Sequence, residues 1–63
     1  MFKKYEALSE AYETMIRFAN EALCKMMEAE AVEDVIAYGA QNEAFMKAAT
    51  AIHEQIMEVL KQL

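Results

Sequence analysis

The chain has 63 residues, of which 57% are hydrophobic and 27% charged, with one glycine, no proline and one cysteine. A core of this size rarely contributes more than about 3–5 kcal/mol, and a lone cysteine excludes an internal disulfide, so we expect a homo-oligomer. The net charge of −5 opposes binding to nucleic acid or to an anionic membrane surface.

The cysteine count and the hydropathy pattern also bear on location. An unpaired cysteine is typical of a reducing compartment, which predicts a cytoplasmic protein. No apolar run approaches the roughly 20 residues that a membrane-spanning helix needs, so we expect no integral membrane association.

The first predicted helix spans about residues 4–28. Its hydrophobic residues recur in alternating steps of three and four, which is typical of a helix that packs along one seam. Cys24 falls on the side opposite this seam and is expected to be exposed. The seam consists of Tyr5, Leu8, Tyr12, Met15, Ala19, Ala22 and Met26.

The connection between the helices is predicted at about residues 29–32, where the phase of the hydrophobic pattern slips by two residues. This segment contains no Gly, Asn or Pro, the usual stop signals. An alternative break lies at Gly39, which could cap one helix while Asn42 begins the next. The break near residue 30 gives two helices of comparable length, and it is the interpretation that we adopt.

The second predicted helix spans about residues 33–62. In an antiparallel hairpin, bulky residues of one helix are expected to face small residues of the other, as Tyr12 faces Ala49. Ala19 is expected opposite Asn42, which leaves a polar amide beside a small residue. An amide at a seam position can fix register and oligomer state, unless it serves as the helix cap. The second seam consists of Val35, Tyr38, Asn42, Phe45, Ala49, Ile52, Ile56, Val59 and Leu63.

These features predict an all-α fold in which residues 1–63 form a single domain, a two-helix antiparallel hairpin. The apolar stripe is wider than one partner helix covers, so we expect the hairpin to dimerise into a four-helix bundle. The residues expected at the oligomer interface are Tyr5, Leu8, Tyr12, Met15, Ala19, Asn42, Phe45, Ala49, Ile52, Ile56 and Val59.

No residue pattern predicts catalysis, and we expect neither an enzyme nor a cofactor. The single histidine, His53, follows Thr50 by three positions, so the Glu-x-x-His spacing of di-iron bundles is absent. We expect His53 to be partly buried at the edge of the seam. Cys24 has no histidine at helical spacing that could activate it as a nucleophile.

Four apolar residues close to the predicted connection lie outside the main seams. They are Leu23, Met27, Val32 and Ile36, and an exposed patch of this kind is typical of a protein-binding site. The sequence therefore predicts a small protein-binding regulator of the inhibitor, adaptor or chaperone type.

A second interpretation is an RNA-binding bundle of the Rop type. On the first helix, the cationic residues follow one edge and the acidic residues the other. Phosphate contacts made by such a basic edge would dominate affinity for RNA. The cationic set is Lys3, Lys4, Arg17 and Lys25, and the acidic set is Glu6, Glu13, Glu21 and Glu28.

A third interpretation comes from the segment Ala29-Glu30-Ala31-Val32-Glu33-Asp34-Val35-Ile36, followed by a long amphipathic helix. This segment resembles the helix junction of phasins, proteins that coat polyhydroxyalkanoate granules. The resemblance implies helices that lay their apolar faces on a hydrophobic surface.

Overall fold

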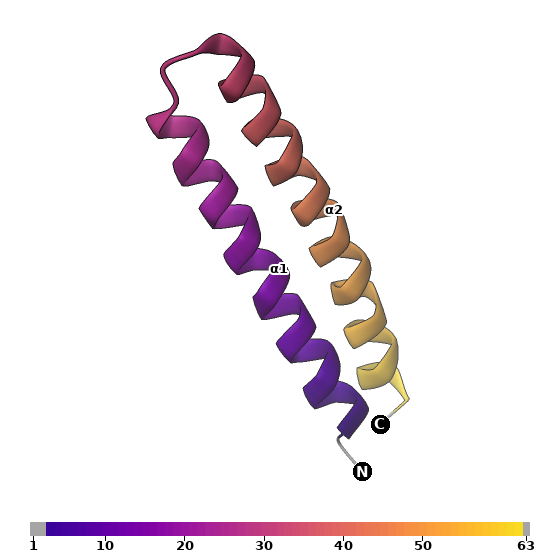
Figure 1. Ribbon diagram of the computed structural model, residues 1–63. Helices are drawn as coiled ribbons and strands as arrows, with labels where there is room; N and C mark the ends of the chain where they lie inside the picture. Colours follow the sequence, from indigo (N-terminus) through magenta and orange to yellow (C-terminus); the bar gives the residue numbers. More distant parts are fainter. Residues whose placement is uncertain (1–2, 63) are drawn as a thin grey trace.

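The computed structural model describes residues 3–62 as two long helices packed side by side (Figure 1). Helix α1 comprises Lys3–Glu28 and helix α2 comprises Val32–Lys61, against predicted spans of about 4–28 and 33–62. The chain reverses direction between them, so α1 begins at the end of the hairpin where α2 ends. The prediction of an all-helical, two-helix hairpin is confirmed.

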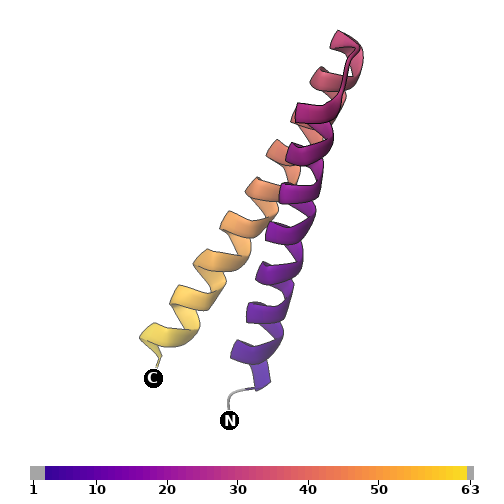
Figure 2. The same ribbon diagram turned by 90° about the vertical axis from the view of Figure 1, so that its left-hand side faces the viewer.

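The hairpin is an elongated body of 48 × 14 × 10 Å. The two helices run side by side in one view (Figure 1) and cross at an angle in the other, where they overlap near the connecting loop (Figure 2). Within residues 3–62, no helix combines the length and the apolar character needed to cross a membrane.

The loop between the helices comprises residues 29–31. Ala31 takes the N-cap position of α2 in an extended conformation, and its side chain makes no capping hydrogen bond. Its carbonyl instead accepts hydrogen bonds from the backbone N–H groups of Asp34 and Val35, both at 3.1 Å. The acidic first turn of α2 and Lys25 in the last turn of α1 complement the helix dipoles. Charge at the helix ends thus substitutes for the missing glycine and asparagine.

Gly39 lies inside α2, so the alternative break at this residue is wrong. The glycine is placed where the helices approach closely. A Cβ atom added at Gly39 would lie 3.3 Å from the Met26 sulfur of α1. The absence of a side chain at this position therefore makes room for Met26.

The buried core is small because two helices can enclose only the strip between them. It consists of Ala19, Ala22, Ala49 and Ile56. Three of these four residues are alanines, which let the two backbones come close together. Among residues 3–62, eight large hydrophobic side chains remain exposed: Leu23, Met27, Val32, Val35, Ile36, Met46, Met57 and Leu60. Leu63, the last residue of the predicted second seam, lies outside the described residues.

Aromatic side chains extend the interface on both flanks of this core. The Phe18 and Phe45 rings lie 5.4 Å apart between centroids. The centroids of the Tyr12 and His53 rings lie 6.0 Å apart. Tyr12 is expected to face Ala49, and His53 lies about one helical turn further along α2. The offset arises because a tyrosine side chain reaches past the small residue opposite its own backbone.

Replacing Gly39 with alanine should raise the free energy of unfolding by about 0.5–1 kcal/mol, since glycine inside a helix costs about 1 kcal/mol relative to alanine. The new methyl group meets only the flexible thioether of Met26, which can rotate away. Urea denaturation at a fixed protein concentration measures the change. A loss of stability would show that the Met26 side chain is held rigidly against residue 39.

Candidate interaction surfaces

The eleven residues expected at an oligomer interface all lie at least partly between the two helices of one chain. Ala19, Ala49 and Ile56 are buried, and the other eight are intermediate in exposure. None of the eleven is exposed. The seam therefore holds the hairpin closed, and its half-exposed margins are the part that a second copy could cover.

Asn42 has its polar partner within the chain. Its side-chain amide donates a hydrogen bond of 2.7 Å to the backbone carbonyl of Ala19, as expected from their facing positions. Since Asn42 lies inside α2, it does not serve as a helix cap. The bond joins the two helices within the halves nearer the connecting loop and opposes sliding of one along the other.

His53 and Cys24 both lie on the surface of the hairpin. The expectation that His53 is partly buried is wrong: His53 is exposed, and its ring lies near the Tyr12 ring with the two planes tilted by 45°. Cys24 is exposed on α1, as predicted. Within residues 3–62, no group of three or more His, Cys, Asp or Glu side chains could hold a metal ion.

The four apolar residues predicted as partner-binding candidates flank the loop, two at the end of α1 and two at the start of α2. Each pair is spaced by four residues and so shares one helix face. Met27, Val32 and Ile36 are 76%, 71% and 67% exposed, and Leu23 is 38% exposed. We call Leu23, Met27, Val32 and Ile36 the turn-end patch.

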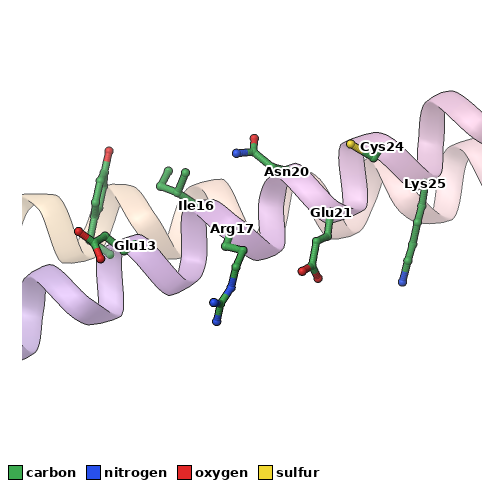
Figure 3. A pocket seen from close by; sticks show the side chains of 8 residues that line it. Glu13, Ile16, Arg17, Asn20, Glu21, Cys24 and Lys25 are labelled. Atoms are coloured by element: carbon green, nitrogen blue, oxygen red, sulfur yellow. The ribbon is translucent and has the colours of Figure 1, made fainter.

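A second surface, not predicted from the sequence, is an open groove of about 630 Å³ on α1 (Figure 3). It runs between two rows of side chains that each recur every four residues. The first row begins with the aromatic ring of Tyr12 and continues through Ile16 to the thiol of Cys24. The groove is lined by Tyr12, Glu13, Ile16, Arg17, Asn20, Glu21, Cys24 and Lys25.

The second row of the groove, which we call the charge row, consists of Glu13, Arg17, Glu21 and Lys25. The assignment of acidic and cationic residues to two separate edges of the first helix is therefore wrong for these four. A spacing of four residues advances only about 40° around a helix, which aligns them in one row of alternating sign. The same spacing, applied to the charged residues alone, could have revealed the row from the sequence.

The charge row makes no internal ion pair. In the part of the chain that the structure describes, the one ion pair joins Lys61 to Glu58 at 3.9 Å. Arg17 lies 5.7 Å from the Phe18 ring centroid, and the Lys25 amine lies 5.9 Å from that of Tyr38. The carboxylates and cations of the row thus stand side by side on the surface without pairing.

Comparison with known proteins finds no match among protein-family models, curated proteins or solved structures. The likeness of residues 29–36 to phasins consequently stays an interpretation of that short segment. A functional assignment has to come from the surfaces themselves.

Proposed function

We propose that this hairpin is a non-enzymatic protein-binding module that works as a homodimer, in the manner of small regulators, inhibitors, adaptors and chaperones. The exposure of the turn-end patch carries the proposal. Its three most exposed members are also the three most exposed of the large hydrophobic residues described. Apolar side chains gathered at one end of a protein are typical of a site that docks into an apolar pocket of a partner.

The homodimer part of the proposal, a four-helix bundle, is supported by the balance of burial in one chain. Four buried residues, three of them alanines, make a thin core for two helices of 26 and 30 residues. The aromatic and aliphatic side chains of the seam are only partly covered. Packing a second hairpin against them would add apolar burial at about 25 cal/mol per Å².

The two other interpretations make different predictions about salt. RNA held through phosphates is released as salt rises. A coat on a hydrophobic granule depends on apolar area and withstands salt. The alternation of sign along the charge row argues for protein over RNA, because Arg17 and Lys25 each have a glutamate four residues away.

The test compares two methionine variants. Met27→Glu places the new charge in the turn-end patch. Met57→Glu places it on α2 near the end of the hairpin opposite the loop, at a residue that is 43% exposed. We expect Met27→Glu to weaken binding of a protein partner at least about tenfold and Met57→Glu to leave it unchanged, because a charge cannot enter an apolar pocket without a large desolvation cost.

The measurement is affinity capture from lysate with tagged wild type and both variants, at low and high salt, followed by titration of the captured protein. A stoichiometric protein bound by wild type and Met57→Glu but lost with Met27→Glu supports the proposal. Capture of RNA alone, of granule material alone, or of a protein insensitive to Met27→Glu contradicts it.

A further inference from the structure

The charge row has a symmetry of its own. Residues of the row at equal distances from position 19 carry opposite charges. Glu13 is six residues before this position and Lys25 six residues after it, and Arg17 and Glu21 are two residues before and after it. A row with this property is complementary to a second copy of itself running in the opposite direction. A twofold interface requires one surface to complement itself in this way.

We infer that two copies of the hairpin pair through the groove on α1, with the two α1 helices antiparallel and a twofold axis that crosses the charge row between Arg17 and Glu21, at the level of residue 19. Arg17 of each copy then meets the other copy's carboxylate at position 21, and Glu13 meets the other copy's amine at position 25. This inference rests on the homodimer of the proposed function. It places the contact on the exposed outer side of α1, where Glu13, Arg17, Glu21 and Lys25 lie, and not on the margins of the seam.

The shape of the groove suits an identical helix. Side chains spaced by four residues form ridges, and the ridge of one helix packs into the groove between two such ridges of another. Here the charge row is the ridge, and the groove beside it has the same spacing. Tyr12 and Ile16 supply apolar area on the far side of the groove, while the four ion pairs occupy the near side.

The absence of ion pairs within the charge row favours a second copy of α1 as the partner that fills the groove. The glutamates and cations of the row stand four residues apart on one helix, yet no two of them pair within 4.0 Å in the described chain. All four can therefore form pairs across the interface without first breaking bonds within the chain. A parallel arrangement would instead place Arg17 against its own copy, and like charges would repel.

The first experiment measures the dimer dissociation constant by sedimentation equilibrium for Arg17→Glu, Glu21→Arg and an equimolar mixture of the two. Each single variant sets like charges against each other at positions 17 and 21, and we expect its dissociation constant to rise about tenfold. The mixture restores opposite charges at every pair, so we expect a heterodimer as tight as wild type. Lys47→Glu, which makes the same charge change on α2, is the control and should have no effect.

The second experiment tests direction by disulfide formation. Asn20 lies one residue from the proposed axis, so Asn20→Cys in a Cys24→Ser background should form an intermolecular disulfide. Wild-type Cys24 should not, because ten residues, or about 15 Å along the helix, separate the two thiols in an antiparallel pair. Efficient cross-linking of wild type with none for Asn20→Cys would overturn the antiparallel arrangement.

The outcomes separate this inference from the proposed function. A dimer whose dissociation constant is unaffected by Arg17→Glu overturns the α1 face and leaves the homodimer standing. A chain that stays monomeric at every concentration overturns both the face and the homodimer. Both variants change exposed residues, and circular dichroism should show unchanged helix content.

Discussion

Replacing Ala49 with leucine is expected to lower the free energy of unfolding by about 2 kcal/mol, since inserting carbons into a filled interface typically costs 1–3 kcal/mol. Ala49 is 2% exposed and is one of the three alanines at which the helices approach each other. Leucine adds three carbon atoms there, and the helices must separate to admit them. That movement would also stretch the hydrogen bond from Asn42 to the Ala19 carbonyl.

The matched control is Ala51→Leu, which makes the same change two residues further along α2 at an exposed position. It should alter stability by less than about 0.5 kcal/mol, as surface substitutions usually do. Thermal and urea unfolding at one fixed protein concentration measures both variants. If Ala49→Leu were as stable as wild type, the space beside Ala49 would have to be empty, and the close approach of the helices at this residue would be wrong.

The hairpin could be predicted from periodicity because a seam repeating every three and four residues has one simple solution in a short chain, two helices packed along it. The break near residue 30 was found from the slip in that pattern rather than from any stop residue. Gly39 suggests a possible break in the sequence, but its backbone has no positive φ angle, and its lack of a side chain makes room for Met26. A sequence does not distinguish a glycine that ends a helix from one that admits a neighbour.

The candidate sites were harder to predict for a different physical reason. Seam residues look alike whether they face a helix of the same chain or of another, so all eleven expected at the oligomer interface could equally close the hairpin. Periodicity predicts His53 at the seam edge, but the structure exposes it, because periodicity places a residue on a helix face and does not describe how far the neighbouring side chains cover it. The exposure of Met27, Val32 and Ile36 could be predicted because these residues depart from the seam. Binding of a partner at the turn-end patch stays a prediction.

Replacing Ile56 with alanine is expected to lower the free energy of unfolding by about 3 kcal/mol, since truncating a buried isoleucine removes apolar burial and leaves a cavity. At 9% exposure, Ile56 is the only large aliphatic residue among the four buried ones described. It lies near the C-terminal end of α2, far from the connecting loop. In a domain whose core contributes about 3–5 kcal/mol, this loss should leave a substantial unfolded fraction at room temperature.

A second isoleucine on the same helix provides the control and connects the fold to the proposed function. Ile36 is 67% exposed, so Ile36→Ala should change stability by less than about 0.5 kcal/mol. Because Ile36 belongs to the turn-end patch, Ile36→Ala should weaken binding of the partner. Ile56→Ala leaves the turn-end patch unchanged, so once an excess of partner has refolded this variant it should keep the contacts of the patch with the partner. Equal stability losses at the two positions would mean that the turn-end patch is packed inside the hairpin or its dimer, and it could then not be the docking surface.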